Sequence, residues 1–150
     1  MSLHIVRLGS PRKPAEGLRI GTVRRPPRGV PKAQFARQNW YDVWFPLLAP
    51  SEETRKLGQA AATPAQWAQF TRRYRREMSV PEARQALALL AALSHDANFS
   101  VGCYCEDEAH CHRSILRELL RESGATSRGH DAWTPGPPAM RCASRPTASA

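Results

Sequence analysis

The 150-residue sequence has no long hydrophobic run and few aromatic side chains. No stretch approaches the roughly 18 consecutive apolar residues that a membrane-spanning helix needs, which excludes an ordinary membrane protein. The N-terminal residues have neither the apolar segment nor the small-residue cleavage site of a secretory signal. We therefore expect a cytoplasmic protein with no membrane partner, and a chain of this length suffices for one hydrophobic core.

Acidic residues are scarce. The chain has 13 Asp and Glu against 22 Lys and Arg, which gives a formal net charge of +9. This charge favours anionic partners such as phosphate-bearing metabolites, nucleotides or nucleic acid. However, the basic residues are spread along the chain, and no aromatic-rich basic stripe or recognised reader motif accompanies them. Nucleic-acid binding is therefore a weaker hypothesis than binding of a small anionic ligand.

Periodic hydrophobic spacing disappears near the C-terminus. From about Ser127 onward, Gly, Pro, Ser, Ala and Thr dominate, and such a composition buries too little surface to offset the entropy of ordering. We expect one compact domain over residues 1–125 and a disordered, flexible tail over residues 126–150. Cys142 lies in that tail, and we expect no role for it.

The remaining sequence alternates between strand and helix patterns. Strands are predicted in residues 3–9, 18–25, the start of 41–50, and 99–105. Gly102, inside the last of these, suggests that another backbone passes close by. Helices are predicted after Ser51, after a Thr63–Gln66 capping box, after a Ser79–Glu82 capping box, and after Cys111 with an end at Gly124. Strands interleaved with helices predict an α/β fold with a small, mostly parallel sheet flanked by helices.

The stretch "VGCYCEDEAHCHRSILRELL" (residues 101–120) holds three of the four cysteines and two of the five histidines. It runs from a predicted strand through a loop into a predicted helix. In open α/β sheets, ligands gather beyond the carboxyl ends of the strands, where loops lead into helices. This stretch is therefore the first candidate for a functional site.

A reactive thiol is one interpretation of this stretch. Cys111 at a helix N-terminus, next to His112 and Arg113, has the surroundings that lower a thiol pKa, so Cys111 is the candidate nucleophile and His112 a candidate acid or base. The acidic residues Glu106 to Glu108 oppose that ionisation.

A metal site is the second interpretation, and a redox-responsive module is a related one. Cys103, Cys105, Cys111 and His112 supply the four S and N ligands that zinc prefers. Their spacing is not one of the usual knuckle patterns, however. Adjacent residues at a helix start point in different directions, which makes joint coordination by Cys111 and His112 difficult, so no metal is expected in the first instance.

An anion cradle is the third interpretation. Free N–H groups at the helix start, together with Arg113 and His112, suit a phosphate or carboxylate. The loop "RRPPRG" follows another predicted strand and adds Arg24, Arg25 and Arg28, which meet the cysteine loop if the two strands are parallel. In a purely structural alternative, Cys103 fills the core, and Arg113 begins a solvated basic face with Arg117 and Arg121 at four-residue spacing.

Four segments of the chain resemble a known family. These are "LRIGTVRRPPRGVPK", "YDVWFPLLAPS", "WAQFTRRYRREM" and "FSVGCYCEDEAHCHRSILRELL", which lie within roughly residues 3–125. They are similar to the DUF488 family of uncharacterised bacterial and archaeal proteins, in which a strand cysteine is followed by an acidic loop and then by Cys-His-Arg at a helix start. The family often has a carboxylate two residues after the strand cysteine, where this chain has Cys105.

The resemblance implies a compact α/β domain and names neither a reaction nor a cofactor. It also draws attention to Arg24, Arg28, Asp42, Trp44 and the Cys-His-Arg run, which match the shared motifs. Tyr74 and Glu77 match a helical motif of the family. We attribute Tyr74 to packing and Glu77 to surface charge. We expect a small anionic ligand, with a phosphate or nucleotide moiety, to bind to Arg24, Arg28, Asp42, Cys103 and Arg113, beside Cys111 and His112 as candidate catalytic groups.

Overall fold

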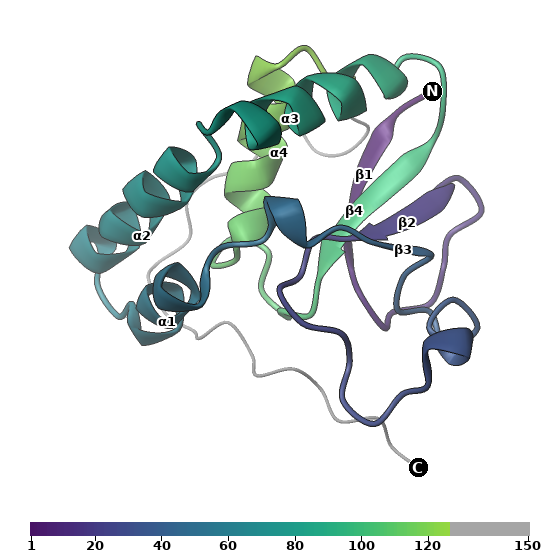
Figure 1. Ribbon diagram of the computed structural model, residues 1–150, viewed down its shortest axis with the longest axis horizontal. Helices are drawn as coiled ribbons and strands as arrows, with labels where there is room; N and C mark the ends of the chain where they lie inside the picture. Colours follow the sequence, from purple (N-terminus) through teal and green to yellow (C-terminus); the bar gives the residue numbers. More distant parts are fainter. Residues whose placement is uncertain (127–150) are drawn as a thin grey trace.

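The computed structural model describes residues 1–126 and confirms the single α/β domain (Figure 1). Four strands, four α-helices and two short 3-10 helices follow one another along this part of the chain. They are β1 (Leu3–Arg7), β2 (Leu18–Gly21), η1 (Lys32–Gln34), β3 (Val43–Trp44), η2 (Pro46–Leu48), α1 (Glu52–Ala60), α2 (Pro64–Glu77), α3 (Pro81–Leu93), β4 (Phe99–Cys103) and α4 (His112–Glu122). The expected boundary at residue 125 stays a prediction, and residues 127–150, including Cys142, lie outside the described residues.

The sheet has the strand order β1-β4-β2-β3, and all three strand pairs are parallel. The last strand in the sequence, β4, is therefore central, between β1 and β2. Parallel pairing puts the carboxyl ends of all four strands at one edge of the sheet. As a result, the loop after β2 and the loop after β4 start side by side, as the sequence pattern predicted.

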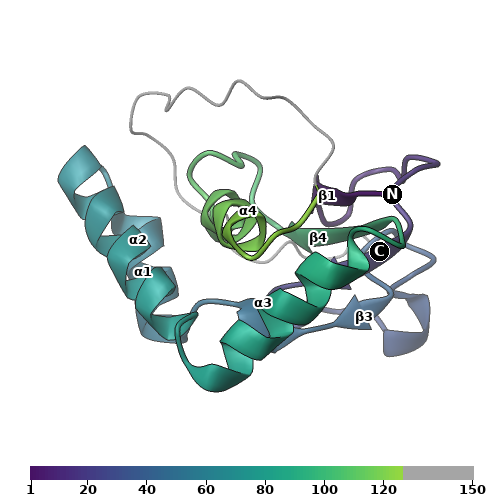
Figure 2. The same cartoon turned by 90° about the horizontal axis from the view of Figure 1, so that it is seen from above.

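One face of the sheet forms the main hydrophobic core with the helices. Val101 of β4 is fully buried, and so are Tyr74 of α2 and Leu116 of α4. Helices α3 and α4 lie next to each other beside the sheet, and α1 and α2 form a pair farther out (Figures 1 and 2). Since α2 also contacts α4, the α1–α2 pair is fixed relative to the strand edge.

Loop residues, rather than helices, cover the other face. A Cβ atom on Gly21 would lie 2.5 Å from the ring of Tyr41, and one on Gly102 would lie 2.5 Å from the side chain of Leu8. The prediction that a backbone passes close to Gly102 is therefore wrong, because the side chains of Leu8 and Val6 occupy that space. These two glycines let loop side chains lie directly on the strands.

Side chains cap the starts of α1 and α2, whereas α3 and α4 begin without a side-chain cap. Ser51 accepts a hydrogen bond from the Thr54 N–H, and Thr63 and Gln66 form the predicted capping box. The Ser79–Glu82 capping box is wrong. The Ser79 hydroxyl donates to the Arg76 carbonyl, and α3 starts at Pro81, where proline suits the first helical position without a side-chain cap.

Glu77, at the C-terminal end of α2, has a structural role that the sequence pattern did not indicate. Its carboxylate accepts hydrogen bonds from the Ser51 N–H at 3.0 Å, from the Thr54 hydroxyl at 2.6 Å and from the Ser51 hydroxyl. The attribution of Glu77 to surface charge is therefore wrong. These bonds join the end of α2 to the start of α1 and so hold the α1–α2 pair in place.

Among the described residues, no helix has both the length and the apolar character needed to cross a membrane.

At the end of the described chain, the Thr126 carbonyl accepts a hydrogen bond from the Leu3 N–H at 2.8 Å.

Candidate functional site

A pocket of about 230 Å³ opens at the carboxyl edge of the sheet, between the loop after β2, the loop after β4, and the α1–α2 pair. Arg24 and Arg28 line it from the first loop, Cys103 from the end of β4, and His112 from the first residue of α4. Four predicted site residues, distant in sequence, therefore share one cavity. Cys111 and Arg113 are buried behind its wall, and Asp42 does not line it.

Arginines surround the mouth of the pocket. Arg24, Arg25, Arg28 and Arg55 line it, and Glu52 is the single carboxylate among the lining residues. Glu52 forms ion pairs with Arg25 at 2.9 Å and with Arg55 at 2.8 Å, and the hydrogen bond from Arg55 is the main cause of its lowered pKa. The pocket therefore has an excess of positive charge.

Two of these arginines differ in how they are held. Arg24 donates to the carbonyl oxygens of Ala49 and Pro50 at 2.9 and 3.2 Å, so its guanidinium is fixed against the pocket wall. The side chain of Arg28 is exposed and forms no hydrogen bond or ion pair with another residue of 1–126. Within the described residues, its guanidinium donors are therefore available for a ligand.

Cys103, Cys111 and His112 form a compact buried cluster at the inner end of the pocket. Their ligand-type atoms, two sulfurs and one imidazole nitrogen, all lie within 4.8 Å of one another. Cys103 is the last residue of β4, and Cys111 is the N-cap of α4. The loop between these residues therefore brings the Cys111 sulfur close to the Cys103 sulfur. Cys103 lines the pocket, whereas Cys111 is fully buried.

The position of His112 follows from its contacts. Its Nε2 lies 2.8 Å from the Thr22 carbonyl oxygen, which only accepts hydrogen bonds, so Nε2 carries a proton and donates it to that oxygen. The other ring nitrogen, Nδ1, lies 3.7 Å from the Cys111 sulfur. Neutral His112 therefore presents the Nδ1 lone pair to the thiol and can take its proton.

The two thiols have opposite pKa shifts. Burial by itself raises the pKa of Cys111, but the hydrogen bond from Cys103 and the nearby groups His112 and Arg113 outweigh burial and hold this pKa well below the ordinary thiol value. The hydrogen bond to Cys111, followed by burial, raises the pKa of Cys103 well above that value. The pair therefore releases one proton readily and retains the second.

Arg113 is a buried cation beside this cluster. It is 2% exposed and donates to the Cys105 carbonyl at 2.6 Å, while its Nε is buried with no hydrogen-bond partner in the described structure. The alternative in which Arg113 begins a solvated basic face is therefore wrong. The first turn of α4 is covered by the loop after β4, and only later turns reach solvent.

The geometry also bears on the metal alternative. The argument that Cys111 and His112 cannot face a common ion is wrong, because their ligand atoms and that of Cys103 lie together. Cys105 is not part of this group, although its sulfur lies 3.5 Å from the Cys103 sulfur.

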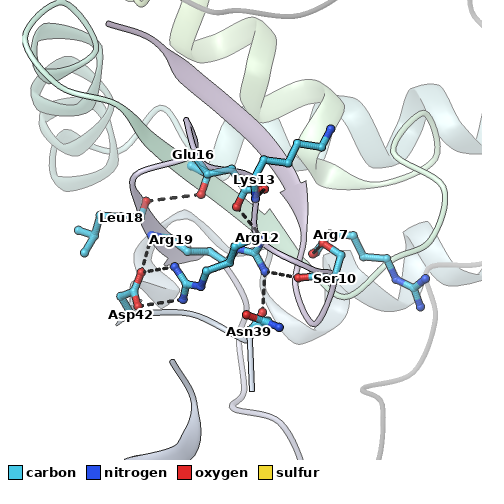
Figure 3. Close-up of polar contacts among 10 residues, drawn as sticks. Arg7, Ser10, Arg12, Lys13, Glu16, Leu18, Arg19, Asn39 and Asp42 are labelled. Atoms are coloured by element: carbon cyan, nitrogen blue, oxygen red, sulfur yellow. Dashed lines mark hydrogen bonds and ion pairs between the residues drawn. The ribbon is translucent and has the colours of Figure 1, made fainter. Parts of the chain in front are cut away.

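Asp42 has a different environment from the other predicted site residues. It pairs with Arg12 through two 2.9 Å contacts and accepts a 2.8 Å hydrogen bond from the Arg19 N–H (Figure 3). Burial raises the pKa of Asp42, but these hydrogen bonds outweigh it and give a lowered pKa. The contacts tie Asp42 to the start of β2 and to the loop before it, away from the cavity.

Sequence reasoning did not identify the aromatic wall of the pocket. Trp67 and Phe70 of α2 line the cavity, with ring centroids 4.8 Å apart in a stacked arrangement. His110 lies edge-on to Trp67 at 5.6 Å and is held by Asp107 at 2.6 Å. The 3 and 4 spacing of the α2 aromatics indicates a core stripe, so no sequence pattern indicates that Trp67 also faces a cavity.

Of three comparisons with known proteins, one gives a match, and it identifies a family. No curated protein and no solved structure matches the chain. A family model, DUF488-N3a, described as the active DUF488-N3 subclade, matches residues 3–124. That match spans every strand and helix described above and both loops that line the pocket. The chain therefore belongs to the DUF488 family, as a member of the DUF488-N3a subclade.

Proposed function

We propose that this protein binds a small phosphate-bearing ligand, of the nucleotide class, in the pocket, and that a thiol at its inner end takes part in a covalent step. One observation carries the proposal: four arginines and a buried Cys–Cys–His cluster converge on one cavity from separate parts of the chain. The family description, an active subclade, is consistent with a catalytic role.

The arginines account for the anionic part of the ligand. Guanidinium groups bind phosphate oxygens through paired, charge-assisted hydrogen bonds. Within residues 1–126 the Arg28 guanidinium has no protein partner to give up, and Arg24 is already oriented by its carbonyl contacts. The charge of Glu52 is shared between Arg25 and Arg55, so the pocket keeps its positive excess.

The aromatic wall accounts for a second, planar part of the ligand. A half-buried indole at a pocket surface offers the face on which a ring stacks, and stacking on an aromatic side chain contributes about 1–3 kcal/mol per base. Trp67 has this position, supported from behind by Phe70. Arginines and an indole in one cavity favour a nucleotide over inorganic phosphate.

The thiol step uses the cluster as a unit. Cys103 is the sulfur that lines the pocket, and its proton can pass to Cys111, which in turn faces Nδ1 of His112. The Cys103 sulfur then bonds to an electrophilic atom of the ligand, and the leaving group departs with the electrons of the broken bond. In this scheme Cys103 is the nucleophile, and Cys111 and His112 hold the proton.

A ligand screen with matched variants tests the binding part. Thermal shift and calorimetry would compare inorganic phosphate, nucleoside monophosphates and nucleoside triphosphates on reduced protein in the presence of a chelator. We expect a nucleotide to stabilise the wild type and the exposed-arginine control Arg37→Ala equally. We expect Arg28→Ala to weaken binding on the order of tenfold, the size of a single charge-assisted contact.

Two outcomes would contradict the proposal. One is equal binding of every nucleotide by the Arg28→Ala and Arg37→Ala variants, which would put the ligand outside the pocket. The other is tight binding of single-stranded oligonucleotides, with steep salt dependence, and none of mononucleotides, which would support nucleic-acid binding instead.

A further inference from the structure

We propose that the reduced protein binds one Zn²⁺ ion between Cys103, Cys111 and His112. The two sulfurs and the imidazole nitrogen already lie within 4.8 Å of one another, and all three side chains are buried. Zinc–sulfur and zinc–nitrogen bonds of about 2.3 and 2.1 Å in a tetrahedron place an S and an N ligand about 3.6 Å apart. The Cys111 sulfur and His112 Nδ1 are 3.7 Å apart, so this edge of the site is preformed.

The second contact of His112 supports a ligand role independently of that spacing. A histidine that binds a metal through one nitrogen usually donates from the other to a carbonyl or carboxylate, which fixes the ring. Nε2 of His112 donates to the Thr22 carbonyl at 2.8 Å. Thr22 is itself held, because its N–H and hydroxyl both donate to the Gly102 carbonyl, at 3.0 and 2.9 Å.

The donor set selects the type of metal. Two thiolates and one imidazole suit Zn²⁺ and other thiophilic ions and do not suit Mg²⁺ or Ca²⁺, which prefer oxygen. Two thiolates neutralise the charge of the ion, so the buried Arg113 faces a site without net charge. Its 2.6 Å bond to the Cys105 carbonyl fixes its guanidinium on that acceptor.

The fourth coordination position faces the cavity, since Cys103 and His112 both line it. A three-ligand site with an open position is typical of zinc ions that bind a water or a substrate oxygen. The consequence for thiol chemistry rests on the proposed function. Coordination draws electron density from a thiolate, so a zinc-bound Cys103 is a weaker nucleophile than the free thiolate.

Cobalt binding tests the site without any activity assay. Reduced full-length protein, stripped of metal with a chelator that is then removed, would be titrated with Co²⁺. We expect one equivalent to produce thiolate charge-transfer absorption and the visible bands of tetrahedral Co²⁺, and one equivalent of Zn²⁺ to abolish both. Cys111→Ser and His112→Asn are each expected to weaken Co²⁺ binding by at least about tenfold. The control His95→Ala, an exposed histidine outside the pocket, should bind like the wild type.

The proposal is overturned if the wild type shows no charge-transfer band, or if Cys111→Ser and His112→Asn, shown by circular dichroism to be folded, both bind Co²⁺ as tightly as the wild type. Should one of the two variants not fold, Co²⁺ binding by the other variant alone decides the question. Failure of the zinc proposal is distinct from failure of the proposed function, because the nucleotide screen is carried out with a chelator present.

Discussion

Replacement of His112 with alanine is expected to slow the alkylation of Cys103 at neutral pH by at least about tenfold. In the wild type, His112 Nδ1 lies 3.7 Å from the Cys111 sulfur, and the Thr22 carbonyl holds the ring in the orientation that accepts the thiol proton. Without this acceptor the Cys103–Cys111 pair holds its first proton more tightly, and once the thiol pKa is above the pH, each further unit lowers the thiolate fraction about tenfold. The rate would be measured on chelator-treated protein with iodoacetamide, followed by peptide mass spectrometry.

His110→Ala is the matched control for this measurement. His110 also lines the pocket, but its contacts are an ion pair with Asp107 and an edge-on contact with the Trp67 ring, and it is not part of the thiol cluster. We expect its loss to change the rate by less than about twofold. Equal rates for folded His112→Ala and wild type would contradict the assignment of His112 as the proton acceptor.

Replacement of Glu16 with glutamine is expected to destabilise the fold by about 3–5 kcal/mol, as is usual when a buried charge loses its partner. Arg19 is fully buried and Glu16 is 3% exposed, and their side chains meet at 2.6 Å. The remaining acceptors for Arg19 are the Ser10 and Asn39 carbonyls, at 2.9 and 2.6 Å, which carry no net charge (Figure 3).

Urea denaturation measures this loss, and Glu53→Gln is the control. Glu53 pairs with Arg73 on the surface, where its side chain is 83% exposed, so we expect a change below about 1 kcal/mol. A Glu16→Gln variant that unfolds at the same urea concentration as the control would show that the pair adds nothing to stability.

The fold was largely predictable because it depends on local signals. Ser51 and the Thr63–Gln66 box cap their helices as expected, and Gly124, with a φ of 98°, follows the end of α4. The predicted strands extend beyond the observed ones. Residues 18–25, for example, form β2 over Leu18–Gly21 only, whereas the strand predicted at the start of 41–50 is the short β3, which ends before Pro46 begins η2.

The meeting of the arginine loop and the cysteine loop was predictable as well. Both loops follow strands of a parallel sheet, and such strands end at the same edge. The sequence could not show that β4 lies directly beside β2, because strand order depends on contacts between distant segments. That adjacency is what puts Thr22 next to His112.

The burial of charged and polar groups was not predictable. Arg19 stands at a polar position in an alternating strand, and Arg113 at four-residue spacing with Arg117 and Arg121. Arg19 and Arg113 are nevertheless both buried. In each case the acceptors come from other segments, such as Glu16 for Arg19 and the Cys105 carbonyl for Arg113. Neither pairing leaves a periodic signal, because each depends on a loop that folds over the side chain.

Protection of Cys103 by the ligand tests the central claim most directly, namely that the arginines and the thiol serve one binding site. The alkylation rate of Cys103 would be measured with and without a nucleotide that binds the wild type, and with the same concentration on Arg28→Ala. We predict a slower rate on nucleotide binding in the wild type and little protection in the variant, because the ligand fills the cavity that Cys103 lines. An unchanged Cys103 rate in a wild type saturated with nucleotide would contradict the claim.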